Sequence, residues 1–352
     1  MKITVQAYAK LNLHLSVAAP RSDGYHPVSS LMRSISLHDT LEIEIHPEGH
    51  LTRSPDLDTG PPSEHHSTAR IKHASRIVFP QATVDWTCFP EDPAPPGENL
   101  VLRAIQTFLE SLGSESARHP GLCSGRGWGP VTYKMALHKQ IPAGAGLGGG
   151  SADAAAALAG LAHLHGMQLD DVTQLAAPLG ADVPFSLSGG TALVTGIGET
   201  VSPQIDPHDF HALLVVPSVP IATHWAYRAL DRTGNLLPVN ENLSAIWDVY
   251  STQGPTSLGQ FARNSFESVV YSRFPVLLRI REALIEAGAR WALLSGSGST
   301  VFGVFDEAQS LLRARESFRS PDETCRLIPV TGVSRGITVH SHSQGPPMEV
   351  SR

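Results

Sequence analysis

The chain has little cysteine and no long apolar run. Cys88, Cys123 and Cys325 are scattered over 352 residues, which indicates neither a disulfide framework nor a zinc cluster. No stretch approaches the roughly 18 apolar residues of a membrane-spanning helix. Polar residues such as Gln6 and Lys10 interrupt the N-terminal segment, so it lacks the apolar core of a signal peptide. We therefore expect a cytoplasmic protein without membrane contacts.

Positive charge is also scarce. Lys and Arg number 26 against 33 Asp and Glu, a formal net charge of −7. Nucleic-acid-binding proteins carry a basic stripe, so we expect no nucleic-acid surface. The content of 41% hydrophobic and 17% charged residues is ordinary for a globular protein, and the length predicts two domains.

Glycine, by contrast, is concentrated in one segment. Residues 141–158 read IPAGAGLGGGSADAAAAL, with Ser151 and Asp153 where the glycines give way to alanines. Glycine has the most permissive backbone and alanine is the best helix former, so the segment predicts a loop that leads into a helix. The free N–H groups and positive dipole end of such a helix bind phosphate. We interpret the segment as a nucleotide-binding loop.

Three other interpretations of this loop are open. Gly144-x-Gly146-x-x-Gly149 matches the dinucleotide fingerprint, but Asp170 and Asp171 lie in a helix-like segment and not at a strand end. A Walker A loop needs Gly-Lys-Ser/Thr, and here the serine follows three glycines without a lysine. A glycine hinge before a packed helix is the purely structural alternative.

Helical and strand periodicities are mixed along the whole chain. Alternation predicts a strand over residues 2–17, with Lys10 and Asn12 on the same side. Residues 47–97 are rich in proline and histidine without sustained periodicity, which predicts a mobile loop insertion. Further strands are expected within residues 31–46, 131–142, 211–223, 291–294, 301–305 and 325–339, and helices within 98–112, 152–165, 169–179, 223–232, 255–270, 276–288 and 307–317.

Two charged residues outside the loop could complete a phosphotransferase. Such an enzyme needs positioned phosphates, a cation and a group that orients the attacking hydroxyl. Lys10 and Asp182 could supply the last two. Each has a structural alternative, Lys10 as an edge-strand lysine and Asp182 as a helix-cap or turn aspartate. Sequence spacing does not show whether the two side chains meet.

Three separated segments resemble the motifs of the GHMP kinases: AYAKLNLHLSV, IPAGAGLGGGSADAAAAL and LLSGSGSTVFGVF. Within that superfamily, RSDGYH, ENLVLRA, GADVPF and GGTALVTGIGE are similar to the branch that acts on 4-diphosphocytidyl-2-C-methyl-D-erythritol. The similarity covers residues 2–339 except 47–97. It implies phosphorylation of the 2-hydroxyl of that small molecule with ATP and Mg²⁺, in the non-mevalonate route to isoprenoid precursors.

The resemblance also implies residue roles. Lys10 matches the lysine that neutralises charge at the transferred phosphoryl group, and Asp182 matches the carboxylate that accepts the hydroxyl proton. Tyr25 and His26 match the pair that holds the cytosine, and Tyr227 matches the aromatic residue on its other face. From the sequence alone, Tyr25 could equally be a turn aromatic and Tyr227 a core residue. The expected substrate-binding residues are Asn12, Tyr25, His26, Thr223 and Tyr227.

On the nucleotide side, the glycine loop matches a triphosphate cradle, and Ser151 is expected to face Mg²⁺ as well. Asn99 and Lys139 match positions near the adenine. Asp153 is expected to be a first-turn acid that stabilises the helix dipole, and not the catalytic base. The expected nucleotide-binding residues are Pro142, Ala143, Gly144, Ala145, Gly146, Leu147, Gly148, Gly149, Gly150, Ser151, Asn99 and Lys139.

The implied fold is α+β in two lobes, with the site between them. An N-terminal lobe similar to ribosomal protein S5 is expected over residues 1–209, with an insertion at 47–97, and a ferredoxin-like lobe over 210–340. Residues 341–352 are expected to be a disordered tail.

Ile197 departs from the family pattern, which has a polar residue at this position. Two other functions stay open: a GHMP kinase for another small alcohol, of the homoserine or mevalonate type, and a nucleotide-binding homologue without turnover.

Overall fold

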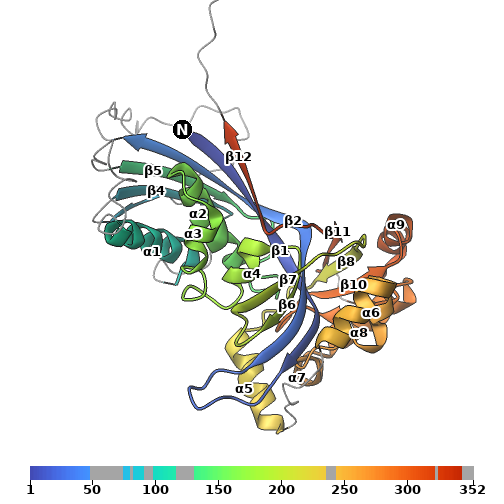
Figure 1. The fold of residues 1–352 in the computed structure, drawn as a ribbon. Coiled ribbons are helices and arrows are strands. Elements are labelled where there is room, and N and C mark those ends of the chain that lie inside the picture. Colours follow the sequence, from blue (N-terminus) through green and yellow to red (C-terminus); the bar gives the residue numbers. More distant parts are fainter. Residues whose placement is uncertain are drawn as a thin grey trace, which may run out of the picture.

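The computed structural model describes residues 1–47, 74–79, 82–90, 98–115, 131–234, 243–321 and 324–342, which form two β-sheets flanked by helices (Figure 1). This α+β, two-lobed arrangement agrees with the expected fold class. In spatial order the larger sheet contains β12 (Ile337–His342), β1 (Lys2–Val17), β2 (Val28–Pro47), β5 (Val131–His138), β4 (Ala82–Phe89) and β3 (Ala74–Val78), and β6 (Thr191–Thr195) and β7 (Thr200–Gln204) extend it beside β2.

The long antiparallel pair of β1 and β2 forms the centre of the larger sheet. Their register runs from Lys2 opposite Glu44 to Val17 opposite Val28, with shifts on either side of the short stretch that contains Lys10. The strand predicted over residues 2–17 is therefore confirmed. β12 borders β1 only over Lys2–Ala7, and beside Lys10 the glycine loop takes its place, where Lys10 N donates to Leu147 O. Because Lys10 is only 5% exposed, the interpretation of it as an edge-strand lysine with its ammonium in water is wrong.

Helices cover one face of this sheet. They are α1 (Leu100–Glu115), α2 (Gly149–Leu164), α3 (Leu169–Thr173) and α4 (Val183–Ser188) (Figure 1). The alanines of α2 are buried, and a Cβ at Gly160 would lie only 2.5 Å from Ile43 Cδ1. Small side chains thus let α2 lie directly on the sheet. The helix predicted over residues 169–179 ends early, since α3 stops at Thr173 and turns follow.

Residues 47–97 were predicted to be a loop insertion, and that prediction is wrong for the part that the structure describes. β3 and β4 lie within it, and β4 pairs in parallel with β5. Along ATVDWTCF, buried Ala82, Val84, Trp86 and Cys88 alternate with less buried residues. This alternation is a strand signal, but it is short and flanked by proline-rich sequence. The rest of the predicted insertion lies outside the described residues.

A second sheet organises the C-terminal half. It is antiparallel, in the order β11 (Arg326–Thr331), β8 (His211–Val216), β10 (Val301–Phe305) and β9 (Trp291–Leu294). The helices of this half are α5 (Thr223–Thr233), α6 (Leu243–Gln253), the 3₁₀-helix η1 (Pro255–Gln260), α7 (Glu267–Arg273), α8 (Pro275–Glu286) and α9 (Ala308–Ser317).

The continuous helix predicted over residues 255–270 is wrong. It is interrupted between η1 and α7, where the backbone pairs with β1: Leu15 N donates to Arg263 O at 2.7 Å, and Ser265 N donates to Leu15 O at 2.9 Å. These bonds satisfy backbone groups that a helix would have used internally, and they tie the two halves of the molecule together.

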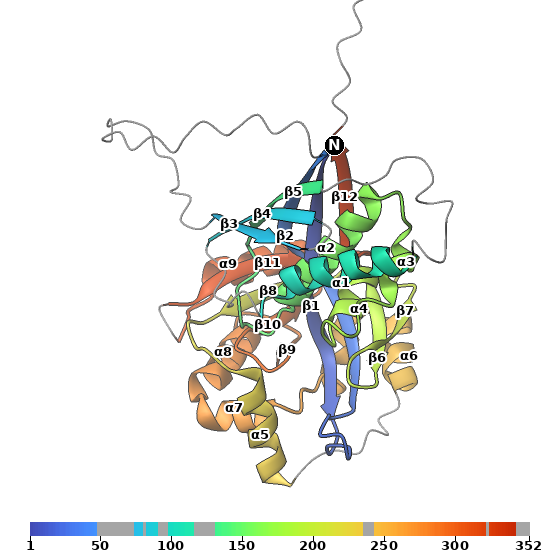
Figure 2. The same ribbon diagram turned by 90° about the vertical axis from the view of Figure 1, so that its left-hand side faces the viewer.

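The first strand and the last described strand pair in the larger sheet. β12 pairs with β1 from Lys2 opposite His342 to Ala7 opposite Ile337, and Figure 2 shows the two strands side by side. The domain boundary predicted at residue 209 stays a prediction. β12 follows the second sheet in the sequence but belongs to the larger sheet of the first half. Residues 343–352 of the predicted tail lie outside the described residues, while 341 and 342 belong to β12.

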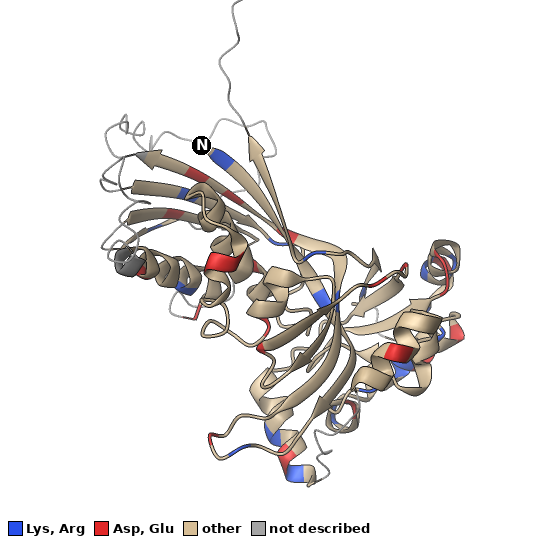
Figure 3. Cartoon of the chain, viewed as in Figure 1, with Lys and Arg blue, Asp and Glu red and all other residues tan. Residues whose placement is uncertain are grey.

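Two surface properties can be compared with expectation. In the described part of the chain, no helix is both long and apolar enough to cross a bilayer. Lys and Arg are scattered among Asp and Glu over the elements drawn in Figure 3, without a continuous basic stripe on the described residues seen there.

Candidate active site

A cavity of about 1130 Å³ lies where the glycine-rich loop, the β1–β2 pair and α5 approach one another. It is lined by every residue that the sequence predicts for catalysis, nucleotide binding or substrate binding, together with Ile197. The roles of these residues stay predictions. Their convergence from distant parts of the chain defines the candidate site.

Lys10 and Asp182 meet inside this cavity. The Nζ of Lys10 lies 3.5 Å from Asp182 Oδ2. Lys10 is only 5% exposed, whereas the Asp182 side chain is 33% exposed and open to a ligand. A buried ammonium beside a reachable carboxylate is the pair that a phosphotransferase needs.

Asp182 precedes α4 at its N-cap position. Its carboxylate nevertheless makes no capping hydrogen bond to α4 in the described structure and instead faces Lys10. An aspartate at this position usually accepts a bond from the first-turn N–H groups. The structure therefore does not support the interpretation of Asp182 as a capping residue.

Lys10 is held by a chain of hydrogen bonds across β1 and β2. Its Nζ donates to Asn12 Oδ1 at 2.7 Å, and Asn12 Nδ2 donates to Ser30 Oγ at 2.8 Å. The Ser30 hydroxyl donates to the carbonyl of His14 at 2.7 Å. These directions fix the Asn12 amide with its oxygen toward the ammonium. Ser30 was missed from the sequence, because it belongs to no motif and its position depends on strand register.

The glycine loop packs tightly against Lys10. Gly148 is the N-cap of α2 with φ of 74°, and a Cβ there would lie 2.9 Å from Lys10 Cγ. The backbone of Lys10 also donates to Leu147 O at 3.0 Å. Glycine at residue 148 thus permits both the left-handed turn and the passage of the lysine side chain beside it.

The third GHMP kinase motif, residues 293–305, packs on the same loop. Ser295 Oγ donates to Gly146 O at 2.9 Å, and Thr300 N donates to Ala145 O at 3.2 Å. A Cβ at Gly146 would lie 2.0 Å from Ser295 O, so only glycine allows this approach. The loop is therefore held between β1 and the C-terminal sheet.

The start of α2 provides the anion-binding feature of the cavity. Gly149, Gly150 and Ser151 form its first turn and line the cavity, and Gly148 has no side chain to cap them. The N–H groups of a first turn have no partners within the helix, and the dipole of a 16-residue helix adds positive potential. This end of the cavity suits phosphate groups.

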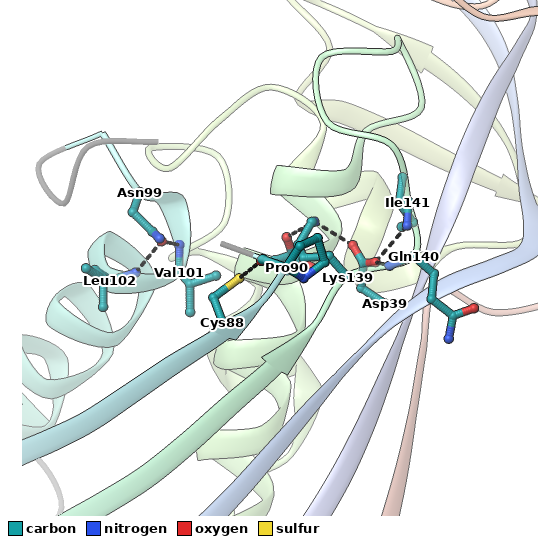
Figure 4. Close-up of polar contacts among 10 residues, drawn as sticks. Asp39, Cys88, Pro90, Asn99, Val101, Leu102, Lys139, Gln140 and Ile141 are labelled. Atoms are coloured by element: carbon teal, nitrogen blue, oxygen red, sulfur yellow. Dashed lines mark hydrogen bonds and ion pairs between the residues drawn. The ribbon is translucent and has the colours of Figure 1, made fainter. Parts of the chain in front are cut away.

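Lys139 makes a different set of contacts from those expected of an adenine neighbour. Its Nζ lies between two carboxylates, 2.6 Å from Asp39 Oδ2 and in close contact with Asp153 Oδ2. Asp39 also accepts the N–H groups of Gln140 and of Ile141, the latter at 2.8 Å (Figure 4). The Asp39–Lys139–Asp153 trio therefore holds the start of the glycine loop.

The expectation that Asp153 is a first-turn acid is wrong. It is the fifth residue of α2, is 3% exposed and contacts Lys139. Burial raises the pKa of Asp153 well above its usual range, and the Asp39 carboxylate adds to this shift. Burial opposes the charge of Lys139, but attraction to Asp153 and Asp39 prevails and raises the pKa of Lys139.

Asn99 immediately precedes α1 and lines the cavity. Its Oδ1 accepts the N–H groups of Val101 at 2.9 Å and Leu102 at 3.2 Å (Figure 4). The residue is 4% exposed and is an N-cap in the usual sense. Its side-chain oxygen is thus engaged by the helix, and its predicted contact with adenine stays a prediction.

Aromatic side chains line the other end of the cavity. Tyr25 is 58% exposed. This exposure agrees with a residue that stacks on a ligand ring, and equally with an aromatic residue in a surface turn. The ring of His26 lies 5.0 Å from that of Tyr227, which packs edge-on against Phe266 at 4.9 Å. Burial, with the nearby Asp182 charge, raises the pKa of Tyr227 to about 12, so its phenol stays protonated at neutral pH.

Two further contacts shape this end. Thr223 Oγ1 and Ser297 Oγ lie 3.1 Å apart and connect α5 to the third motif. The N–H of Ile197 donates to Glu199 Oε2 at 2.6 Å. Ile197 thus contributes an apolar side chain to the cavity wall where the family pattern predicts a polar one.

Comparison with protein-family models matches residues 99–190 to the GHMP kinases N terminal domain and residues 251–322 to the GHMP kinases C terminal domain. A 4-diphosphocytidyl-2-C-methyl-D-erythritol kinase of Thermodesulfovibrio yellowstonii is 33% identical over 333 residues, covering 93% of this chain and 97% of the relative. The kinase of the same name from Geobacter sulfurreducens is 34% identical, covering 91% of this chain and 95% of that protein.

Solved structures give the same picture of the fold. A crystal structure of 4-(cytidine 5'-diphospho)-2C-methyl-D-erythritol kinase matches with a TM-score of 0.63 at 30% identity, covering 94% of this chain and 98% of that one. A homoserine kinase from Cytophaga hutchinsonii matches with a TM-score of 0.64 at 17% identity, covering 96% of this chain and 97% of that one. The second likeness concerns the fold alone.

Proposed function

The chain belongs to the 4-diphosphocytidyl-2-C-methyl-D-erythritol kinases of the GHMP kinase superfamily, and on this premise we propose that it transfers the γ-phosphoryl group of ATP to the 2-hydroxyl of 4-diphosphocytidyl-2-C-methyl-D-erythritol. The products are ADP and the 2-phosphate, in the non-mevalonate route to isoprenoid precursors. The observation that carries the proposal is the Lys10–Asp182 pair beside the uncapped start of α2.

The glycine loop would bind the triphosphate of ATP. Residues 149–151 line the cavity at the positive end of α2, where an anion is favoured. The packing of the third motif on Gly146 keeps the loop in this shape without the ligand. Such preorganisation lowers the free-energy cost of ordering the loop when ATP binds.

Asp182 would accept the proton of the attacking hydroxyl. As the hydroxyl oxygen forms its bond to the γ-phosphorus, the bond from that phosphorus to the oxygen bridging to ADP breaks, and the hydroxyl proton moves to the carboxylate. Lys10, held by Asn12 Oδ1, would offset the negative charge on the transferred group. The Lys10 ammonium keeps its place because Asn12 is itself held by Ser30.

The donor atoms of the cavity fit Mg²⁺. The hydroxyl of Ser151 lines it at the start of α2, and Mg²⁺ is typically held by one or two protein oxygens plus phosphates and water. The residues that the structure describes contain no cluster of three His, Cys, Asp or Glu arranged for a metal. When bound, Mg²⁺ would neutralise phosphate charge.

The proposed reaction uses only small molecules. We propose that it takes place in the cytoplasm, without nucleic-acid or membrane partners.

The test is ADP release by the purified protein with ATP and Mg²⁺. The cytidylyl substrate is compared with homoserine, mevalonate and a control without acceptor. Turnover with the cytidylyl substrate alone is expected. Turnover with homoserine or mevalonate instead would assign the site to another alcohol, and ADP release with none of them would make the protein a nucleotide-binding homologue.

A further inference from the structure

A buried amide behind the cavity, that of Asn264, is engaged at every position. Asn264 is 3% exposed and lies in the break between η1 and α7. Its Nδ2 donates to Leu294 O at 2.8 Å and to Gly296 O at 2.7 Å. Its Oδ1 accepts a hydrogen bond from Phe266 N at 2.9 Å. Carbonyl oxygens only accept and an N–H only donates, so these partners fix the orientation of the amide.

The two carbonyl groups held by Asn264 lie on either side of Ser295 in the third motif. Ser295 is the residue whose hydroxyl donates to Gly146 O and so holds the glycine loop. The same segment also holds the N–H group of Leu294, which donates to Glu267 Oε1 at 3.1 Å. The turn on which the glycine loop rests is therefore fixed from behind by residues 264–267.

Gly296 also borders the ammonium of Lys10. It lines the cavity with φ of 55°, and a Cβ on it would lie 3.4 Å from Lys10 Nζ and 3.2 Å from Gly146 O. A carbonyl beside an ammonium is a ready acceptor for it. In the described structure, Lys10 Nζ donates to Asn12 Oδ1 and makes no hydrogen bond to the Gly296 carbonyl, which is engaged by Asn264 instead.

We propose that Asn264 is a positioning residue for phosphoryl transfer: its amide fixes the turn at residues 294–296 under the glycine loop and keeps the Gly296 carbonyl off the Lys10 ammonium. This inference rests on the proposed function for the reaction, but its effect on nucleotide binding does not. Asn264 does not line the cavity and acts through the third motif. Its sequence segment predicts a helix, and the amide reaches the third motif where pairing with Leu15 interrupts that helix.

Two substitutions remove the grip on the turn in different ways. Asn264→Ala deletes both hydrogen bonds to the carbonyl groups. Asn264→Asp keeps the size of the side chain and the bond from Phe266 N, but it directs an oxygen at two carbonyl oxygens. Ser265→Ala is the matched control, because the Ser265 hydroxyl accepts a hydrogen bond from Val17 N at 3.0 Å, and its bonds in the described structure go to β1 and α7.

Nucleotide binding and turnover are measured on folded protein, well below the melting temperature of each variant. Calorimetry gives the Kd of a non-hydrolysable ATP analogue. Asn264→Ala should raise this Kd and lower kcat by about tenfold each, because the loop must then be ordered on binding. Asn264→Asp should exceed both effects. Ser265→Ala should lower the melting temperature and leave Kd and kcat within about twofold of wild type.

A double-mutant cycle tests whether Asn264 acts through the third motif. Ser295→Ala removes the bond from that motif to Gly146 O. If Asn264 acts through this bond, the double variant Asn264→Ala/Ser295→Ala should have a Kd within about twofold of that of Asn264→Ala alone. Effects of the two substitutions that simply multiply would overturn the proposed route.

Hydrogen exchange of the wild-type protein needs no variant to fold. The N–H of Gly298, which donates to Ser295 O at 2.9 Å, should be protected before the ATP analogue is added as well as after. Protection that arises only with the nucleotide would show that the turn is not fixed beforehand and would overturn the proposal.

The role of Asn264 also falls if Asn264→Ala matches Ser265→Ala in both Kd and kcat, since a purely structural residue lowers stability alone. The proposed reaction is judged separately, by turnover of the cytidylyl substrate in the wild-type protein. Turnover with no special effect of Asn264→Ala would remove the role of Asn264 and keep the kinase. A raised Kd in Asn264→Ala without turnover in wild type would keep the positioning role and remove the reaction.

Discussion

The ammonium of Lys10, on the central strand β1, lies 3.5 Å from the carboxylate of Asp182, which precedes α4. The two residues come from separate motifs and meet because α4 packs against both β1 and α2. Lysine ammonium groups usually lie in solvent, but Lys10 is buried in the sheet. Aspartates at N-cap positions usually cap their helix, but Asp182 makes no capping hydrogen bond. Both are instead directed to the cavity.

Replacing Lys10 removes the cation beside the transferred phosphoryl group. Lys10→Met keeps the length of the apolar stem, so we expect kcat to fall by about a hundredfold or more while the fold is retained. Steady-state kinetics and a thermal melt measure the two effects. Lys2→Met, at an exposed lysine paired with Glu42, is the control and should leave kcat unchanged. Equal kcat values in both variants would contradict the role of Lys10.

A methyl group on the glycine loop should disturb the site directly. Gly148→Ala places its Cβ 2.9 Å from Lys10 Cγ, so we expect a lower kcat and a higher KM for ATP. Gly166→Ala is a matched control, because its φ of 69° is equally left-handed but nothing lies within 4 Å of the added methyl group. Both variants should lose some stability, and only Gly148→Ala should lose activity. Similar kinetic losses in both would mean that strain alone is responsible.

The raised pKa of Asp153 predicts a dependence of stability on pH. The folded chain holds the Asp153 proton to a higher pH than the unfolded chain, which releases it near pH 4. The stabilisation from this group is therefore complete at low pH and is lost as the pH rises toward the raised folded pKa. Asp153→Asn has no such proton, so its melting temperature relative to wild type should increase with pH above about 4. A difference that stays constant with pH would contradict this account.

Replacement by asparagine should destabilise the fold more at Asp39 than at Asp153. Asp39 is fully buried and accepts hydrogen bonds from two backbone N–H groups and from the Lys139 ammonium. The NH₂ group of an asparagine in its place would face at least one of these donors without an acceptor between them. We expect Asp39→Asn to lower the melting temperature more than Asp153→Asn and to raise the KM for ATP. Thermal melts and kinetics at one pH provide the comparison.

Tyr25 tests the aromatic end of the cavity. It is largely exposed and packs against little else, so its loss should not affect folding. Tyr25→Ala should raise the KM for the cytidylyl substrate by about tenfold through lost stacking, with the KM for ATP unchanged. Tyr25→Phe retains the ring and is expected to behave like wild type. An unchanged KM in Tyr25→Ala would mean that this residue is a plain turn aromatic.

Much of the site could be predicted because its residues lie in local patterns. The pattern of the glycine loop alone predicts a phosphate-binding turn. The roles of Lys10 and Asp182 were implied by the resemblance of their segments to the GHMP kinase motifs, and they stay predictions. Asp39 could not be found in this way, since it reads as one polar position in a strand and acts through Lys139, far along the chain. The hydrogen bonds from Asn264 to the third motif likewise join segments that are separate in the sequence.

The errors in predicted structure have similar causes. β4 carries an alternating pattern that predicts a strand, but its proline-rich flanks obscured it. The break between η1 and α7 has no strong local signal, because it is made by backbone bonds to Leu15 in the other half of the molecule. Tertiary pairing determined the structure in both places.

The most direct test of the account is the Asp182→Asn variant, measured for turnover and for nucleotide binding in the same preparation. The amide keeps the size of the side chain but cannot accept the hydroxyl proton as a base. The account predicts that kcat with the cytidylyl substrate falls by about a hundredfold or more, while the Kd of a non-hydrolysable ATP analogue stays within about twofold of wild type. A near-normal kcat in this variant would contradict the assignment of Asp182 and, with it, the proposed mechanism.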